Sequence, residues 1–225
     1  MLRWIVSLVF LTLTAMSADW SQLKPDERVA DVKRRLEATL KQDLNAVGLK
    51  LGNAVFIRVI KESSEMELWL QPAADKPFQR FKTFPIARWS GTLGPKQKEG
   101  DLQAPEGFYG ITRKLMHPGS KYHLAMNIGY PNAQDRALGR TGSLIMIHGS
   151  NVSLGCFAMT DPLIEEIYLL VDAALTAGQA EVPVHSFPFR MTEERLAQTT
   201  DSPWHSFWQQ LKRAWDALEN DKRLP

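Results

Sequence analysis

Residues 144–159 constrain the fold more than any other stretch of this sequence. Two short apolar runs, 144–147 and 157–159, enclose a small, polar segment that is rich in glycine and serine. Apolar runs of this length with such boundaries are typical of buried strands, so we expect a strand, a tight loop and a second strand. His148 ends the first strand and Cys156 begins the second. Two strands joined in this way can hold an imidazole beside a thiol.

Cys156 is the only cysteine in the 225 residues, which excludes an intramolecular disulfide. A buried cysteine that acts as a small apolar side chain is one interpretation, and a core histidine is the matching interpretation of His148. An imidazole that takes the proton of a thiol instead creates a nucleophile for carbonyl groups. We predict an acyl-transfer centre with Cys156 as nucleophile and His148 as general base and acid. The backbone N–H groups of Gly155 and Cys156 are the expected oxyanion donors.

The first residues predict export. Arg3 precedes the apolar run 5–13, and small residues follow at 15–17, which is the pattern of a signal peptide. The run is shorter than the roughly 20 residues that a membrane-spanning helix needs, and an uncleaved anchor is the alternative. The net charge of +2 and the lack of a basic cluster argue against a nucleic-acid partner.

Helical spacing brackets a β-rich middle. Apolar residues recur at three- and four-residue steps from Pro25 to Leu44, and Gly48 follows as a stop, which predicts an amphipathic helix across the outside of a sheet. Alternating apolar residues then predict strands over 55–59, 65–70, 78–86, 108–115 and 122–128.

The C-terminal third predicts two more helices. Asp161 is the expected cap of a helix that Gly178 ends, and a strand near 182–187 follows. Ser202 precedes a last helix whose aromatic stripe favours packing over a sugar-binding platform. We expect a signal peptide at 1–17, a helical lead-in at 18–50, a catalytic domain at 51–192 and a helical extension at 193–225.

Two polar loops interrupt the strands. The glycine-rich segment 91–110 is interpreted as a connection between strands, with substrate binding as the less favoured alternative. The long loop 129–142 leads directly to His148, and loops of this length are often functional. We predict substrate contacts in this loop and in the turn before the cysteine, from Tyr130, Asn132, Asp135, Arg136 and Ser153. Asp135 and Arg136 can equally serve only to tie the loop together.

The residues around the cysteine resemble a known active site. Segments 147–149 and 153–156 look like the signature of the L,D-transpeptidase catalytic domain, the YkuD-like family. Segment 105–109 resembles the strand entry of that family. Further segments are similar to the YafK-like branch, described as peptidoglycan meso-diaminopimelic acid protein amidases: 94–97, 130–133, 135–137, 147–149, 155–160 and 188–192. The sequence departs from the wider family at Leu154, where a histidine is usual, and at 157–158, where a polar residue is common.

The resemblance implies an α+β fold. A mostly-β catalytic domain of sandwich or barrel-like sheets would carry an N-terminal helix and C-terminal helices packed on it. It also implies a periplasmic enzyme whose thiolate attacks the carbonyl at the L-centre of diaminopimelate in a peptidoglycan stem peptide.

The implied partners are stem peptides and a peptidoglycan-linked outer-membrane lipoprotein, which hydrolysis in the YafK-like branch detaches. Transfer to an amine, which makes crosslinks or attaches protein, is the alternative, and a non-catalytic peptidoglycan-binding module is a further one. We expect no cofactor and no metal, since one cysteine and one nearby histidine do not make a zinc site.

Overall fold

Alternating apolar residues in the middle of the chain form the larger of two β-sheets. The computed structural model of the protein describes residues 19–224. The sheet has the order β3-β2-β1-β9-β4. Its strands are β1 (Ala54–Ile60), β2 (Glu65–Gln71), β3 (Gln79–Pro85), β4 (Gly107–Ile111) and β9 (Val182–Phe187). β1 pairs antiparallel with β2 and parallel with β9, so β9 returns from late in the sequence to the centre of the sheet.

A smaller sheet carries the cysteine segment. Its order is β5-β6-β7-β8, with β5 (Met116–His117), β6 (Ala125–Asn127), β7 (Met146–His148) and β8 (Phe157–Ala158). The backbone of Arg88, just after β3, forms an isolated bridge with Ala158 in β8. The two sheets are therefore joined next to the cysteine.

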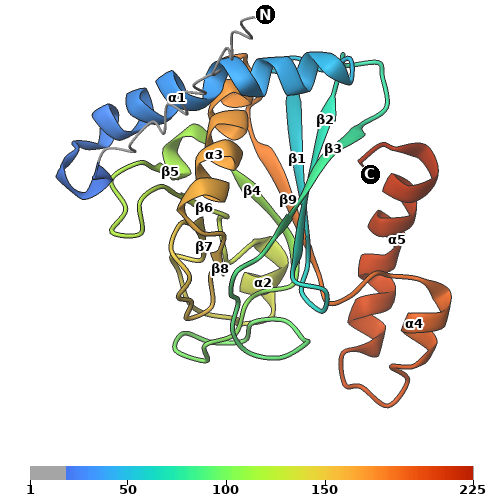
Figure 1. Cartoon of the computed structure of the whole chain (residues 1–225). Coiled ribbons are helices and arrows are strands. Elements are labelled where there is room, and N and C mark those ends of the chain that lie inside the picture. Colours follow the sequence, from blue (N-terminus) through green and yellow to red (C-terminus); the bar gives the residue numbers. More distant parts are fainter. Residues whose placement is uncertain (1–18, 225) are drawn as a thin grey trace, which may run out of the picture.

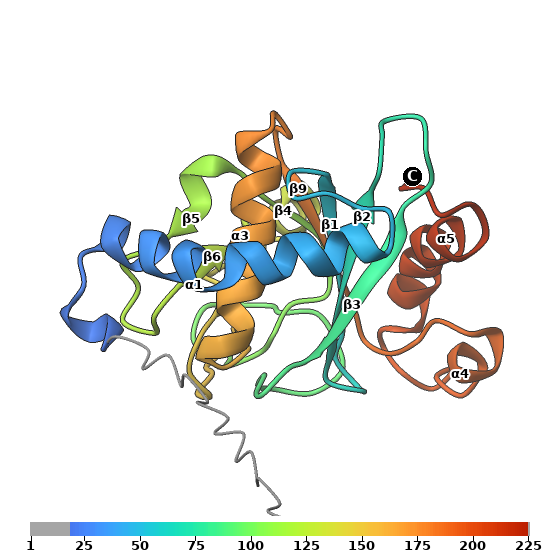
Figure 2. The ribbon, with the colours of Figure 1, turned by 45° about the horizontal axis from the view of Figure 1, so that its top comes forward.

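Helices cover the sheets on two sides (Figures 1 and 2). α1 (Pro25–Ala46) crosses α3 (Asp161–Thr176), and both pack on the main apolar core. α5 (His205–Asp221) and the short α4 (Glu193–Ala197) lie on the opposite side of the larger sheet. The remaining elements are α2 (Ala133–Ala137) and the 3-10 turns η1 (Trp20–Gln22) and η2 (Arg113–Leu115).

The position of α5 explains why β1 is buried on both faces. A second apolar cluster joins Ile60 and Phe187 to Trp208 and Trp215 of α5. Arg58 lies at the same interface, where its guanidinium bonds Glu67 and stacks 4.0 Å from the Trp215 ring. Arg58, the one polar residue of β1, is buried because Glu67 of β2 and the Glu219 and Trp215 side chains of α5 are its partners.

The expected α+β fold is confirmed, with differences at element ends. The helix that begins at Pro25 and the one that Gly178 follows form as predicted, but Thr160 rather than Asp161 is the N-cap of α3. The strand expected over 108–115 ends at Ile111 and continues as η2, and the one over 122–128 shrinks to β6. The helix α2 forms within the predicted loop 129–142, and α4 lies within the predicted helical extension, before its last helix. The predicted signal peptide lies outside the described residues.

Candidate active site

The strands that flank the cysteine segment run parallel. β7 and β8 pair in the register His148 to Ala158, so the eight residues between them cross over instead of forming a hairpin. Parallel connections usually need a dozen or more residues, and this short one suffices because both strands are very short. The register places Cys156 two residues before the partner of His148. The two side chains line one groove, His148 from the end of β7 and Cys156 from the residue just before β8.

The Cys156 thiol is held by the backbone of its neighbouring strand. The Met146 N–H lies 3.4 Å from Sγ, and the thiol faces the Leu144 carbonyl at 3.6 Å. Burial raises the pKa of the Cys156 thiol, and the contact with Met146 and the charge of Lys96 offset only part of this effect. Burial therefore favours the neutral thiol over the thiolate.

The His148 imidazole is oriented by its own loop. Nδ1 lies 2.5 Å from the Gly149 carbonyl, which can only accept, so Nδ1 carries the proton and Nε2 keeps its lone pair. The Tyr122 ring stacks on the imidazole at 4.8 Å. Burial lowers the pKa of His148 despite the bond to Gly149. This tautomer is the one that a general base acting through Nε2 requires.

The groove around the two side chains has a volume of about 420 Å³. It is lined by Arg88, Tyr122, His148, Val152, Ser153, Leu154 and Cys156. Leu154 is 76% exposed and Val152 47%, which leaves an apolar rim on one side of the thiol. The groove therefore combines a thiol, an imidazole, one guanidinium and exposed apolar surface.

Hydrogen bonds hold the turn between His148 and the cysteine at both ends. Ser150 N–H donates to Asp161 Oδ1 at 2.7 Å, and Ser153 Oγ donates to the Cys156 carbonyl at 2.7 Å. Gly155 N–H donates to Ser90 Oγ at 2.6 Å, so this expected oxyanion donor is occupied in the structure. Cys156 N–H is the other expected donor. Both remain predictions.

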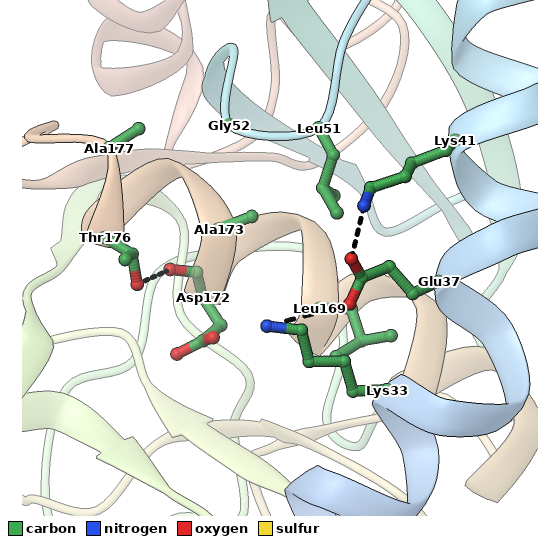
Figure 3. A pocket seen from close by; sticks show the side chains of 10 residues that line it. All are labelled: Lys33, Glu37, Lys41, Leu51, Gly52, Leu169, Asp172, Ala173, Thr176 and Ala177. Atoms are coloured by element: carbon green, nitrogen blue, oxygen red, sulfur yellow. Dashed lines mark hydrogen bonds and ion pairs between the residues drawn. The ribbon is translucent and has the colours of Figure 1, made fainter.

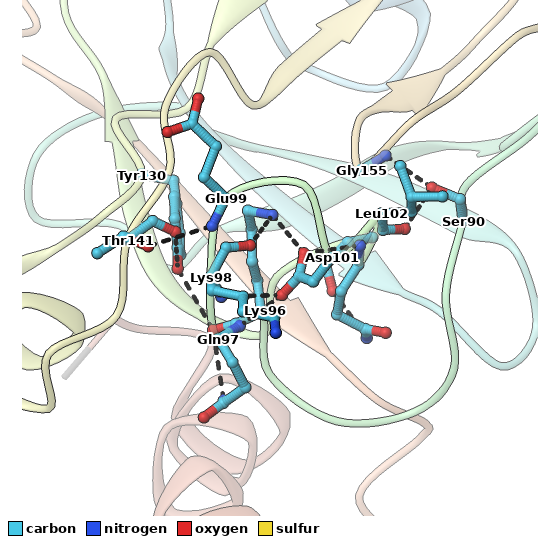
Figure 4. A network of polar contacts seen from close by, with 12 residues as sticks. Ser90, Lys96, Gln97, Lys98, Glu99, Asp101, Leu102, Tyr130, Thr141 and Gly155 are labelled. Atoms are coloured by element: carbon cyan, nitrogen blue, oxygen red, sulfur yellow. Dashed lines mark hydrogen bonds and ion pairs between the residues drawn. The ribbon is translucent and has the colours of Figure 1, made fainter.

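The segment between β3 and β4, which we call the 86–106 loop, contacts the cysteine turn where Ser90 bonds Gly155 (Figure 4). Asp101 organises it by accepting the N–H groups of Gln97, Lys98 and Gln103 and the ammonium of Lys96. Although burial alone would raise it, these bonds lower the pKa of Asp101 to about 2. The backbone carbonyl of Gln103 would lie 3.4 Å from a Cβ at position 155. The loop interpreted as a connection thus contacts the residue next to the nucleophile.

The predicted substrate residues of the 129–142 loop lie elsewhere. Tyr130 is buried, and its hydroxyl faces the carbonyls of Lys96 and Thr141 at 3.3 Å. Asp135 is buried as well and pairs with Arg140 at 2.8 Å. Asn132 and Arg136 line a separate groove of about 430 Å³ beside β4. Of the five predicted substrate residues, the structure brings only Ser153 to the thiol.

Other titratable groups and cavities lie apart from this groove. His123 is buried with Nε2 2.8 Å from Glu165 Oε1, and His185 is buried with its pKa lowered to about 4 by burial and by the charge of Arg58. A cavity of about 330 Å³ between α1 and α3 shares no lining residue with the thiol groove (Figure 3). Residues 19–224 contain no cluster of three potential metal ligands and no helix long and apolar enough to span a bilayer.

Sequence patterns missed three residues at the site. Tyr122, Ser90 and Arg88 stack on the base, bond the turn and line the groove, respectively. Each lies at the end of a predicted strand or in a loop, far from the cysteine in sequence. Their place near Cys156 could not be predicted from residue spacing, because it depends on tertiary contacts such as the bridge between Arg88 and β8.

The chain is similar to known proteins over most of its length. Residues 65–185 match the L,D-transpeptidase catalytic domain family, YkuD. The chain is 42% identical over 175 residues to "Putative L,D-transpeptidase YafK" of Escherichia coli strain K12, which covers 78% of this chain and 70% of the relative. The protein of the same name in E. coli O157:H7 matches equally.

Among solved structures, the K307A mutant of the helical cell shape determining protein Pgp2 from Campylobacter jejuni is similar. It has a TM-score of 0.50 and 21% identity, covering 91% of this chain and 68% of that one. This likeness concerns the fold alone.

Proposed function

Because the chain belongs to the L,D-transpeptidase catalytic domain family, we propose that it is a cysteine-dependent enzyme that acts on peptidoglycan. The observation that carries the proposal is the shared groove of Cys156 and His148, with the imidazole in the tautomer that accepts a proton at Nε2. The substrate is the stem peptide, and the reacting carbonyl is that of diaminopimelate at its L-centre.

The reaction proceeds through a thioester. Nε2 of His148 takes the thiol proton as Sγ of Cys156 adds to the carbonyl carbon. The C–N bond then breaks, and the imidazolium returns the proton to the leaving amine. In the second half, His148 takes a proton from water or from an acceptor amine, the new nucleophile attacks the thioester, and the thiol leaves with that proton.

The opposite pKa shifts of Cys156 and His148 favour proton transfer during the attack on the carbonyl and not before it. Burial raises the pKa of Cys156 and lowers that of His148, so the resting pair is neutral and proton transfer accompanies attack. Backbone N–H groups that point toward the forming oxyanion contribute about 3 kcal/mol each in other hydrolases. Cys156 N–H is the first candidate for this role.

Hydrolysis is the proposed outcome, with release of a covalently bound outer-membrane lipoprotein in the periplasm. The similarity to YafK and the departure from the wider family at Leu154 support this branch. Transfer to an amine, which makes crosslinks, is the second candidate. The exposed side chains of Leu154 and Val152 favour a substrate with an apolar portion next to the scissile bond.

The test uses purified protein and sacculi that carry linked lipoprotein. The wild type should release free lipoprotein and leave the stem peptide intact, as read by mass spectrometry. Cys156→Ala should lose at least a thousandfold in rate. New crosslinks without release would establish transfer, and a Cys156→Ala variant with full activity would end the proposal.

Thiol alkylation separates an enzyme from a binding module that kept only the fold. For a neutral pair, the rate of alkylation of Cys156 should rise with pH beyond the range of an ordinary thiol. A plateau at neutral pH would instead show a preformed thiolate–imidazolium pair. An unreactive thiol at all pH values, together with stem-peptide binding, would favour the binding module.

A further inference from the structure

Arg88 is the only charged residue among those that line the thiol groove. It follows β3, and its backbone is fixed against the strand that Cys156 precedes. Arg88 N–H lies 3.2 Å from the Ala158 carbonyl, and Ala158 N–H lies 2.9 Å from the Arg88 carbonyl. These two bonds fix the backbone of Arg88 opposite Ala158, which lies two residues after Cys156. The exposed side chain of Arg88 lines the groove.

The guanidinium of Arg88 also lacks an internal counter-ion. Within residues 19–224, no carboxylate lies within ion-pair distance of it, and no residue lining the groove is acidic. The buried or half-buried arginines Arg35, Arg58 and Arg140 each pair with a carboxylate instead. An unpaired guanidinium beside a nucleophile is free to bind an anionic group of the substrate.

Guanidinium geometry indicates which group this is. Its planar fork matches a carboxylate in a two-point contact and makes the stronger class of hydrogen bond. Diaminopimelate has two carboxyl groups on separate centres. When the carbonyl at one centre is attacked by Cys156, the carboxylate at the other centre remains free and travels with the same residue. This carboxylate lies at a fixed distance from the attacked carbonyl, so a single cation in the groove can bind it. Arg88 is that cation.

We propose that Arg88 binds the free carboxylate of the diaminopimelate residue whose other carbonyl is attacked. This assignment rests on the proposed function and extends it, because it names the charged group that the groove selects. Arg88 acts as a specificity residue: it positions the acyl donor and takes no part in the proton transfers.

The test is a cycle of protein and substrate variants. Soluble stem peptides are prepared with this carboxylate free or converted to its carboxamide, and kcat/KM is measured for the wild type, Arg88→Gln and Arg88→Lys. A charge-assisted hydrogen bond corresponds to a loss of about tenfold to a hundredfold. For the wild type, kcat/KM should be lower by this factor on the carboxamide peptide than on the free-carboxylate peptide. For Arg88→Gln, kcat/KM on the free-carboxylate peptide should already be lower than that of the wild type by this factor, and the carboxamide peptide should be turned over almost as well. Arg88→Lys should lie between the two.

Two controls make the result specific. Arg213→Gln removes one exposed positive charge from α5, on the far side of the larger sheet, and should discriminate between the two peptides as the wild type does. The pH dependence of Cys156 alkylation should be the same in Arg88→Gln and in the wild type. A shifted profile would mean that Arg88 stabilises the thiolate, and the assignment to the substrate would be wrong.

Binding to the Cys156→Ala background separates this assignment from the proposed function. The inactive protein should bind the free-carboxylate peptide about tenfold or more tightly than the carboxamide, and Arg88→Gln should abolish that preference. If discrimination persists but no variant turns over any peptide, the proposed reaction fails and the Arg88 site stands. If turnover is normal and Arg88→Gln loses equally on both peptides, the Arg88 site fails and the reaction stands.

Discussion

Two polar loops of similar composition have different relations to the thiol. The 86–106 loop and the 129–142 loop are each organised by one buried or half-buried aspartate, Asp101 and Asp135, that accepts several hydrogen bonds. The first loop contacts Gly155 directly through Ser90. The second caps α2 and borders a different groove. Similar local chemistry therefore serves the active site in one case and the scaffold in the other.

The 129–142 loop is hydrogen-bonded to the 86–106 loop. Thr141 N–H donates to the Gln97 carbonyl, and the Glu99 N–H donates to Thr141 Oγ1. The Tyr130 hydroxyl faces carbonyls of both loops. A loop that leads directly to His148 in sequence thus lies away from the thiol groove, whereas a loop 50 or more residues before Cys156 bonds the turn that carries it.

Asp135→Ala tests the structural role of the 129–142 loop and should give the largest effect. The substitution leaves the buried Arg140 without its partner and removes the acceptor of the Tyr109 hydroxyl. We expect the free energy of unfolding to fall by about 3 kcal/mol, as for other broken buried pairs. Urea unfolding measures this change.

In the same variant, kcat/KM per folded molecule should stay within about twofold of the wild type, because Asp135 is remote from the thiol groove. A tenfold loss of kcat/KM at unchanged stability would show that Asp135 binds substrate and would contradict a purely structural role for the 129–142 loop.

Gly155→Ala tests the contact of the 86–106 loop with the cysteine turn. Gly155 has a φ of +104°, and an added Cβ would lie 3.3 Å from Ile145 Cδ1 and 3.4 Å from the Gln103 carbonyl. Relief of this crowding moves the neighbouring nucleophile, and displacement by about 1 Å costs about a hundredfold in rate. We expect a loss of that order in kcat/KM.

Gly139→Ala is the matched control in the 129–142 loop. Gly139 also has a positive φ, +70°, but an added Cβ there meets nothing within 4 Å. Its cost should be limited to backbone strain of about 1 kcal/mol in the free energy of unfolding, with unchanged kcat/KM. Equal activity losses at positions 155 and 139 would refute the distinction between the loops.

Asp101→Asn should have a smaller effect than Asp135→Ala, and one that depends on pH. The pKa of Asp101 is about 2 in the folded protein, against 3.8 for an ordinary aspartate. A lowered pKa stabilises the fold above about pH 4, and the contribution disappears as pH falls through 2. We expect a deficit of about 2 kcal/mol in the free energy of unfolding at pH 7.

Denaturant titrations of the wild type and Asp101→Asn across this range provide the measurement. The two unfolding free energies should converge toward pH 2. A difference that is the same at pH 7 and pH 2.5 would show that the charge of Asp101 does not organise the 86–106 loop.

Local patterns predicted much of the fold. The helix from Pro25 to the stop at Gly48 and the strands β1 and β2 follow from spacing, since an amphipathic helix and alternating strands have distinct periods. The short strands of the smaller sheet and the helices α2 and α4 were missed or misplaced, because two- to five-residue elements carry too little periodic signal. His148 ends β7 as expected, but Cys156 directly precedes β8 instead of beginning it, and the parallel pairing of the two strands was not predicted.

The sequence by itself determined the family and singled out Cys156 and His148 as the candidate pair, because one cysteine with a histidine eight residues earlier in a recognisable segment leaves few alternatives. Only the tertiary structure decided which polar groups surround them. Arg88 and Tyr122 line the groove and Ser90 bonds the cysteine turn, and such contacts depend on chain topology instead of local spacing. For the same reason, Asp101 and Asp135, which are alike in sequence context, have different roles.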